Sequence, residues 1–411
     1  MRLLFSITYF SPYISGLTLY VKRLAEALSE RGFKSTILCM QYERNLPLTQ
    51  TINDVKVIRA KPLFRISKGF LSLDWLVKSW IGVNETDLVL INLPQFEGFI
   101  PAVFGRLFKK KVISIYHCEV ELPKGLLNNF IQSLLILSNL LTLHLTDVII
   151  TYTKDFAQHS QLLPRFANKI NYVYPPIIGP KVDKRVQDMI REKIGEKPDS
   201  TIGVAARLAA EKGIEYLLES IPAIEKNLSL SSRAKSRDLS RMRARTSREI
   251  PRRVTPRNDN KISFKIIVAG PLEPVGETDY KRKIMKLVEK YKENIVFLGS
   301  LKEEDMGSFY SLLDVLVLPS INSTEAFGMV QVEAMMLGVP VIATDMPGVR
   351  IPIRKIGMGK LVPIKNSQKL AEAIVEVLLN KEKYIKDREF IKKEFAFEKT
   401  INFFQRLFTS A

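Results

Sequence analysis

The sequence predicts an α/β fold built from two doubly wound domains that face a central cleft. In the first half, short apolar runs such as TDLVLINL and KKVISIYH alternate with helix-length amphipathic stretches. The same alternation resumes after the proline-rich segment 174–180, with runs such as FKIIVAG and DVLVLPS. Strands separated by helices indicate βαβ units around a parallel sheet. The length of 411 residues also exceeds the roughly 250–300 residues at which one core stops growing.

The proline-rich segment divides the chain into its predicted domains. The first comprises residues 1–176 and the second residues 181–390, while residues 391–411 are predicted to form a helix that returns to the first domain. Ligands of such folds bind at the carboxyl ends of the strands. Residues 229–260 interrupt the second domain. They are rich in Arg and Ser and poor in large apolar side chains, so we predict a disordered and dispensable insertion.

The formal net charge of +19 is unevenly distributed along the chain. Between Ser229 and Lys261, eleven Arg or Lys residues accompany three Asp or Glu residues, so this short segment holds nearly half of the excess. The remainder is spread over the chain and suits a phosphate-bearing substrate or an acidic lipid leaflet. We therefore expect no nucleic-acid partner and retain an anionic membrane surface as a candidate partner.

Cysteine usage and hydropathy bear on the cellular compartment. Cys39 and Cys118 each follow an apolar run, which favours core thiols in a reducing compartment over a disulfide. The start MRLLFSITYF lacks a small-residue cleavage site and is interpreted as a first strand. The longest apolar stretch, Ile131–Ile150, is predicted as a buried helix leading into a strand, because it is interrupted by Gln132, Ser133, Asn139, His144 and Asp147. We expect a cytoplasmic protein, peripheral on the inner face of the cell membrane where it meets lipid.

The most specific pattern is PSINSTEAFGMVQVEAMMLGVPVIATDMPG at 319–348. A polar loop carries Glu325, and a helix that begins near Gly328 carries Glu333. Free N–H groups at a helix start favour an anionic or hydroxyl-rich ligand, and ionised carboxylates accept hydrogen bonds from sugar hydroxyls. The N–H groups expected to face this ligand belong to Phe327, Gly328, Met329 and Val330.

This pattern, with seven residues between its glutamates, resembles the signature of family-four glycosyltransferases. The resemblance implies the GT-B architecture of two Rossmann-like domains and transfer of a hexose from a nucleoside diphosphate sugar with retention of configuration. It places Glu325 by the transferred sugar and Glu333 on the nucleotide ribose. The donor is expected to carry UDP, GDP or ADP, and neither a bound cofactor nor a metal is expected, since no Asp-x-Asp motif is apparent.

A second motif, GVAARLAAEKGIEYLLES at 203–220, agrees with the first. It matches the family pattern G-R-L-x-x-x-K-G, with Ala206 in place of the glycine. Arg207 and Lys212 follow a strand, and one planar guanidinium with one ammonium suits the two phosphates of a nucleoside diphosphate. The resemblance makes them a diphosphate clamp that stabilises charge on the leaving group.

Three further positions rest on the resemblance. Gly16 stands where relatives carry paired glycines facing the donor phosphates, and His117 coincides with the cleft histidine that contacts the donor sugar. Leu301 lies in the turn that faces the nucleotide base. The acceptor, a lipid-linked glycan, polysaccharide or small molecule, is expected on the first domain around 61–80 and 123–130, where basic and apolar residues mix.

Two other classes of function stay open. A sugar-nucleotide epimerase or a phosphorylase shares the two-lobed outline, although nothing singles out the lysine that a pyridoxal cofactor would need. A non-catalytic nucleotide-sugar-binding subunit is the second alternative. Ile351, where relatives often carry glutamate, favours it, and the presence of Arg207, Lys212, Glu325 and Glu333 argues against it.

Overall fold

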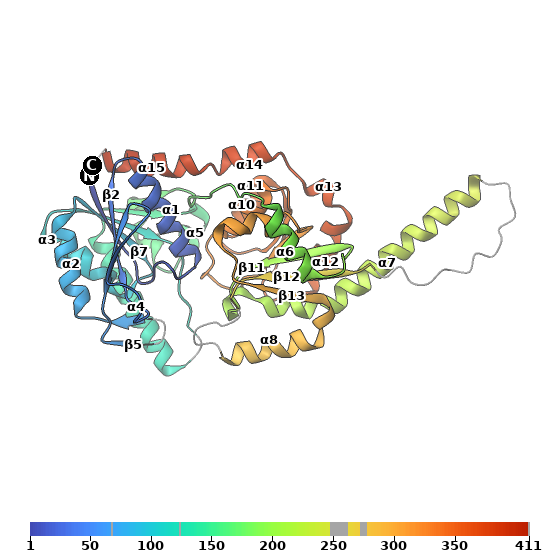
Figure 1. The fold of residues 1–411 in the computed structure, drawn as a ribbon, viewed down its shortest axis with the longest axis horizontal. Coiled ribbons are helices and arrows are strands. Elements are labelled where there is room, and N and C mark those ends of the chain that lie inside the picture. The colour runs from blue at the N-terminus through green and yellow to red at the C-terminus, as the bar shows by residue number, and fades with distance from the viewer. Residues whose placement is uncertain (67–68, 123–124, 247–261, 272–277, 410–411) are drawn as a thin grey trace.

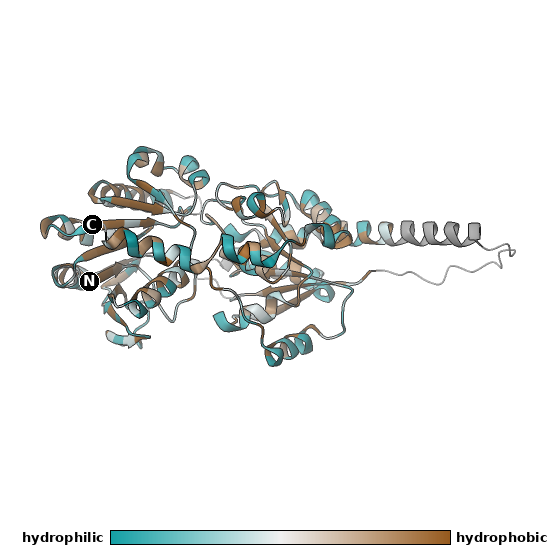
Figure 2. Cartoon of the chain, turned by 90° about the horizontal axis from the view of Figure 1, so that it is seen from above, coloured by the Kyte–Doolittle hydropathy of each residue, from teal (hydrophilic) through white to brown (hydrophobic). Residues whose placement is uncertain are grey.

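The computed structural model describes residues 1–66, 69–122, 125–246, 262–271 and 278–409. They form two α/β domains that lie next to each other along the longest axis of the molecule (Figure 1). The first domain contains an eight-stranded sheet and the second a six-stranded sheet. Most strands of the two sheets are drawn in brown, the colour of apolar residues, in Figure 2. The expectation of two doubly wound domains is therefore confirmed.

The amino-terminal sheet has the strand order β10-β9-β8-β7-β1-β2-β4-β3. All its pairs are parallel except β3 with β4. The order reverses between β1 and β7, which is where ligands of such sheets bind. Its strands are β1 (Arg2–Ser6), β2 (Lys34–Met40), β3 (Thr49–Ile52), β4 (Val55–Ala60), β7 (Leu88–Leu93), β8 (Lys111–Tyr116), β9 (Val148–Thr151) and β10 (Ile170–Tyr172).

Helices cover both faces of this sheet, and a small hairpin precedes the second helix (Figure 1). Helix α1 starts at a capping box, in which Ser15 accepts from the backbone N–H of Thr18 and the Thr18 hydroxyl accepts from the backbone N–H of Ser15. The helices are α1 (Gly16–Glu30), α2 (Asp74–Glu85), α3 (Phe99–Leu107), α4 (Leu126–Leu145) and α5 (Lys154–His159), and the hairpin strands are β5 (Phe64–Ile66) and β6 (Gly69–Leu71).

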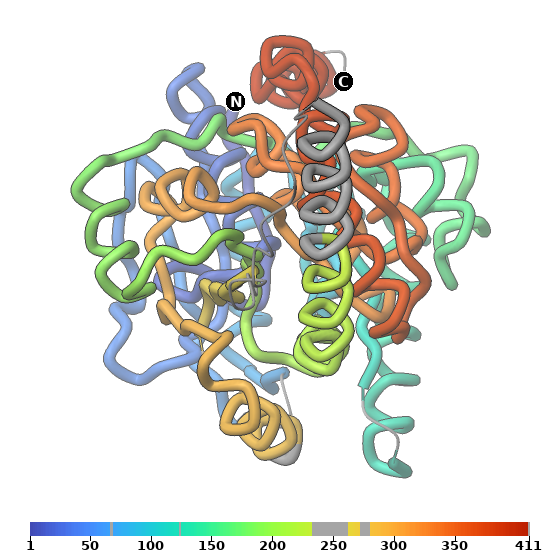
Figure 3. The backbone as a smooth tube through the Cα atoms, turned by 90° about the vertical axis from the view of Figure 1, so that its right-hand side faces the viewer, coloured from blue at the N-terminus to red at the C-terminus, as the bar shows by residue number. Residues whose placement is uncertain are grey.

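Helix α4 is exposed, which corrects the expectation of a buried helix within Ile131–Ile150. Its buried residues are Ser138, Asn139, Thr142 and Leu143, so mainly small polar side chains face the protein. Several of its leucines face outward, and Leu126 is 92% exposed. Among the described residues, α4 is the one helix whose length and composition would allow it to span a bilayer. Its first turns lie at the rim of the molecule when viewed along the long axis (Figure 3, teal).

The carboxyl-terminal sheet is entirely parallel, with the order β13-β12-β11-β14-β15-β16. Its order reverses between β11 and β14. The strands are β11 (Ser200–Ala205), β12 (Phe264–Ala269), β13 (Ile295–Gly299), β14 (Val315–Leu318), β15 (Val341–Thr344) and β16 (Gly359–Val362). The helices are α6 (Lys184–Ile194), α7 (Ile214–Thr246), α8 (Thr278–Lys290), α9 (Met306–Tyr310), α10 (Met329–Met336), α11 (Ile351–Ile356), α12 (Ser367–Leu379), α13 (Lys381–Tyr384) and α14 (Arg388–Glu394).

Helix α7 differs from the expectation for residues 229–260. It continues without a break to Thr246 and extends away from the domain (Figure 1). Residues 229–246 contain many Arg, Ala, Lys, Leu and Met residues, which are good helix formers, and this propensity explains the continuation. The remaining part of the predicted insertion, 247–260, lies outside the described residues.

The last helix, α15 (Phe397–Thr409), packs against α1 of the first domain. The ring centroids of Phe408 and Phe33 are 5.9 Å apart. The Arg31 guanidinium pairs with Glu398 and donates to the Gln405 side chain at 2.7 Å. The chain therefore ends on the domain in which it began (Figures 1 and 2).

Candidate functional site

The predicted cations and the first glutamate meet at the strand reversal of the second domain. Arg207 and Lys212 follow β11, and Glu325 follows β14. The Lys212 Nζ lies 2.7 Å from the Glu325 Oε2, and both side chains are partly buried. Residues from the two sequence motifs, far apart in the chain, thus form one site.

Gly213 allows these two loops to approach each other. Its φ is +60°, and a Cβ atom there would lie 2.2 Å from the backbone oxygen of Pro319. The Ile321 N–H also donates to the Glu211 carbonyl at 3.0 Å. A side chain at position 213 would separate the strands' ends, so the glycine fixes the distance between Lys212 and Glu325.

Arg207 is also held by a carboxylate, since its guanidinium pairs with Glu211 four residues later. Both cations of the predicted diphosphate clamp therefore carry an acidic partner in this structure. The charges are close to neutral as a group, and a diphosphate would bind by taking the place of one or both carboxylates. Ionised donors give hydrogen bonds about twice as strong as neutral ones.

Glu333 lies deeper, between the two domains. It is 7% exposed, and its two carboxylate oxygens have different partners. The Oε1 accepts from Arg23 of α1 at 3.0 Å, and the Oε2 accepts from the Tyr310 hydroxyl at 2.9 Å. Sequence reasoning missed Arg23, although it stands at helical spacing with Tyr20 and Leu24 on an otherwise apolar face.

The backbone at the start of α10 is shaped by Gly328, which has a φ of +74°. Its neighbour Phe327 is buried against Tyr174, with ring centroids 5.5 Å apart. Met329 and Val330 supply first-turn N–H groups, which have no partner within the helix. Gly16 lies next to this helix start, because a Cβ atom on it would lie 3.8 Å from the Met329 Cε.

His117 is placed at the end of β8, but in a closed environment. It is 3% exposed. Its Nε2 lies 2.9 Å from the Asn92 Oδ1 and its Nδ1 lies 2.5 Å from the Tyr152 hydroxyl. Because an amide oxygen only accepts, Nε2 carries the proton and Nδ1 accepts from the tyrosine. Burial lowers the pKa of His117 to about 3, so the ring is neutral and would contact a sugar only by exchanging one of these partners.

Leu301 is half-buried in the loop that follows β13 and packs against the main core, so the structure places it at the carboxyl end of a strand but does not bring it into contact with the cations. Cys118, which sequence reasoning treated as a core residue, faces the site. Burial raises the pKa of its thiol to about 12, with Glu325 adding to the rise and Lys212 opposing it. The available signal was its position directly after His117.

Glu97 is a second buried titratable group of the first domain. It lies in the 3-10 turn Phe96–Gly98 after β7 and is 4% exposed. Its Oε2 accepts from the Thr8 hydroxyl at 3.3 Å. Burial raises the pKa of Glu97 to about 7, and this hydrogen bond only partly opposes the rise.

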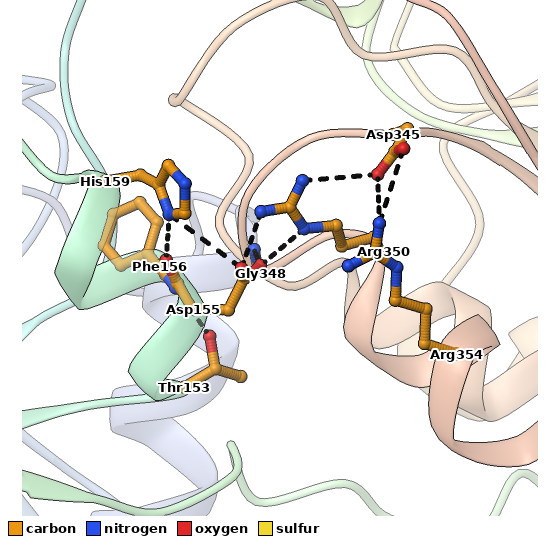
Figure 4. Close-up of polar contacts among 8 residues, drawn as sticks. All are labelled: Thr153, Asp155, Phe156, His159, Asp345, Gly348, Arg350 and Arg354. Atoms are coloured by element: carbon orange, nitrogen blue, oxygen red, sulfur yellow. Dashed lines mark hydrogen bonds and ion pairs between the residues drawn. The ribbon is translucent and has the colours of Figure 1, made fainter.

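An ion pair joins the domains beside the site (Figure 4). Asp155 of α5 accepts from the Gly348 N–H at 2.7 Å and from the Arg350 Nε at 2.8 Å. Burial acts to raise the pKa of Asp155, but these hydrogen bonds outweigh it and lower the pKa. Gly348 has a φ of +79°, and a Cβ atom on it would lie 2.1 Å from the Ala326 oxygen.

A model of Glycosyltransferase Family 4 matches residues 14–178, and a model of Glycosyl transferases group 1 matches residues 252–394. The chain belongs to the family 4, group 1 glycosyltransferases. The matched ranges include His117, Glu325 and Glu333, whereas Arg207 and Lys212 lie between them. As a member of this family, the protein is a nucleotide-sugar-dependent glycosyltransferase.

Relatives of this glycosyltransferase agree with the assignment. The uncharacterized glycosyltransferase MJ1607 of Methanocaldococcus jannaschii is 26% identical over 379 residues, covering 89% of this chain and 85% of the relative. The phosphatidyl-myo-inositol mannosyltransferase of Mycobacterium leprae is 38% identical over 96 residues, 23% of this chain and 25% of that protein. HepE from Anabaena, solved with UDP and glucose, has a TM-score of 0.72 at 17% identity, covering 100% of both chains. This likeness supports the GT-B fold.

Proposed function

We propose that this glycosyltransferase moves a hexose from a UDP-, GDP- or ADP-linked donor to a lipid or glycan acceptor, with retention at the anomeric carbon. The contact between Lys212 and Glu325 at the strand reversal carries the proposal. It joins the predicted phosphate-binding cation to the predicted sugar-binding carboxylate. HepE, a structural relative, was solved with UDP and glucose, which favours a donor of this kind.

The chemistry assigned to these residues begins when the donor diphosphate binds. Phosphate oxygens take the place of Glu211 at Arg207 and of Glu325 at Lys212. The released Glu325 carboxylate then accepts hydrogen bonds from hydroxyls of the sugar. The bond between the anomeric carbon and the diphosphate oxygen breaks, and the two cations stabilise the charge that develops there. The acceptor hydroxyl attacks from the same face, and its proton passes to the departing phosphate. No protein nucleophile is needed.

The test is a screen of UDP-, GDP- and ADP-sugars for binding and hydrolysis, followed by two lysine variants. Lys212→Ala should weaken binding of the preferred donor about ten- to a hundredfold, because one charge-assisted contact contributes roughly 1.5–3 kcal/mol. Lys381→Ala is the matched control, since Lys381 pairs with Asp314 at 2.7 Å in the same domain. The donor-site assignment is wrong if both variants bind the donor as the wild type does.

We further propose that the acceptor is presented at a membrane that helix α4 contacts. This helix has no Asp, Glu, Lys or Arg along its 20 residues. Its outward side is apolar, and the exposed residues Leu126, Phe130, Leu134, Leu137 and Leu141 follow helical spacing. Exposed apolar patches of this extent mark interaction surfaces.

The neighbouring elements extend this apolar surface and add positive charge. Helix α3 packs between α2 and α4, and Trp80 of α2 contacts Phe104 of α3. Exposed Lys61 precedes the hairpin that leads into α2, and exposed Arg65 lies in its first strand, β5. Amphipathic surfaces with cations at their edge bind the boundary of anionic bilayers. The Mycobacterium leprae relative is named for a phosphatidyl-myo-inositol acceptor.

Vesicle binding tests this second part. Phe130→Glu should reduce retention on phosphatidylglycerol vesicles at least tenfold, because a buried Phe contributes about 1.5–3 kcal/mol. Phe390→Glu is the control, since Phe390 is 50% exposed on α14 of the other domain. Equal retention of both variants would contradict the membrane surface. A change of oligomeric state in Phe130→Glu alone would instead identify α4 as a subunit interface.

A further inference from the structure

Arg23 is a buried charge that finds its carboxylate partners in the other domain. Its side chain is 5% exposed on the inward face of α1. Its Nε donates to Glu303 at 2.7 Å, one guanidinium nitrogen donates to the Pro176 carbonyl at 3.1 Å, and the other donates to Glu333 at 3.0 Å. Glu303 and Glu333 belong to the second domain, and Pro176 belongs to the connecting segment. Burying a charge is costly unless it is paired and hydrogen-bonded, so this site fixes the domains to each other.

The hydrogen bonds on Glu333 leave a defined pattern of acceptors. An ionised carboxylate offers about four lone-pair sites, two on each oxygen. Arg23 occupies one site on Oε1, and Tyr310 occupies one site on Oε2. Each oxygen retains one acceptor site, an arrangement that matches two neighbouring hydroxyls of a ribose.

We propose that Arg23 is a positioning residue, which orients Glu333 to accept both ribose hydroxyls and makes recognition of the ribose depend on the contact between the domains. The inference rests on the proposed function and on the ribose-binding role that the family resemblance implies for Glu333. The second domain supplies the carboxylate, and the first domain supplies the cation that holds it in place. Without Arg23, the buried carboxylate would lose its counter-charge and turn away from the ribose.

Lys22 provides a matched control on the same helix. Its Nζ pairs with Glu303 at 3.1 Å. Glu333, by contrast, is held by Arg23 and Tyr310. A Lys22→Ala variant therefore weakens the same domain contact and leaves the carboxylate of Glu333 held as before. A role of Arg23 in domain packing alone predicts similar effects of the two substitutions, whereas a role in orienting Glu333 predicts different ones.

The experiment compares affinities for a nucleoside diphosphate and for its 2′,3′-dideoxy analogue, measured by calorimetry with the nucleotide that the donor screen selects. The wild type should prefer the ribonucleotide about ten- to a hundredfold, as two hydrogen bonds to a charged group would give. Arg23→Gln should bring this preference close to one by weakening the ribonucleotide alone. Tyr310→Phe, which removes one hydroxyl without a change of ring, should lower the preference as well. Lys22→Ala should keep the wild-type ratio.

The outcomes separate the inference from the function beneath it. The ribose assignment, and the inference with it, is contradicted if the wild type binds both nucleotides with equal affinity and Glu333→Gln has the same affinities as the wild type. A wild-type preference that survives in both Arg23→Gln and Tyr310→Phe overturns the inference and leaves the proposed function intact. If Arg23→Gln loses affinity equally for both nucleotides, Arg23 has a purely structural role, and the inference is also overturned. Should Arg23→Gln fail to fold, the ratio in Tyr310→Phe decides.

Discussion

Two buried groups of the amino-terminal domain, His117 and Glu97, should change the folding stability in opposite directions when the pH falls. His117 has its pKa lowered to about 3, so below pH 6.5 the unfolded chain binds a proton that the folded chain does not. Its contribution to stability is complete above pH 6.5 and is lost as the pH falls toward 3. Glu97 has its pKa raised to about 7, so the folded chain holds a proton between pH 4.5 and 7 that the unfolded chain releases. Its contribution grows as the pH falls through 7.

The two magnitudes follow from these pKa values. For His117, the difference between the pKa of the folded and unfolded states lowers the free energy of unfolding by about 2 kcal/mol between pH 7 and pH 5. One pKa unit is worth about 1.4 kcal/mol once titration is complete. For Glu97, the corresponding pKa difference raises the free energy of unfolding by about 2 kcal/mol over the same interval. The two changes nearly cancel in the wild type, so each becomes visible only when the other group is replaced.

Urea unfolding followed by tryptophan fluorescence measures the free energy of unfolding at each pH. Both tryptophans, Trp75 and Trp80, lie on α2 of the domain that contains His117 and Glu97, so the signal reports that domain. Relative to the wild type, Glu97→Gln should lose about 2 kcal/mol on going from pH 7 to pH 5, and His117→Gln should gain about as much. With urea slopes of about 1–3 kcal/mol per molar, the midpoints move by about 1 M. Identical pH responses in the wild type and Glu97→Gln would refute the protonated buried carboxyl.

Three other substitutions follow from the described contacts. Arg207→Ala, like Lys212→Ala, should weaken nucleoside diphosphate binding about ten- to a hundredfold in calorimetry. The melting temperature should stay within a few degrees of the wild type, because an exposed or half-buried ion pair contributes little to folding stability. A large fall in melting temperature would argue for a structural role. Gly348→Ala should lower the melting temperature more than Gly195→Ala, because both glycines have positive φ but only the first would drive a Cβ into backbone, and equal melting temperatures would contradict this. Replacing residues 229–260 by a short Gly-Ser linker should leave donor affinity unchanged, and a loss of binding would show that the segment belongs to the site.

The alternation of strands and helices was enough to predict two doubly wound sheets, because buried parallel strands are apolar along their whole length. Placing Arg207, Lys212 and Glu325 at strand ends was possible for the same reason. Helix α4 shows where such reasoning fails. Its polar residues suggested a soluble core helix, yet Ser138 and Thr142 face the protein and most of the exposed side chains are leucines. Composition does not tell which side of an uncharged helix is buried.

The contacts between the domains were also beyond reach of the sequence. Arg23 and Glu333 are separated by 310 positions, and Asp155 and Arg350 by 195, so no local pattern relates them. The buried state of His117 is of the same kind, since it depends on Asn92 and Tyr152 from neighbouring strands. A single sequence indicates which residues end a strand, and it leaves open what each meets there.

Helix α15 has a consequence for how the protein is made. Domains usually fold as units while the chain is still being synthesised, beginning from the amino terminus. Here α1 remains without the helix that covers it until α15 has left the ribosome, and Arg31 and Phe33 wait for partners that are translated after the second domain. The nascent first domain is thus incomplete for as long as the second is being synthesised. A premature stop before Phe397 would release a chain that holds every residue of the predicted donor site and still exposes an open face on its earliest helix.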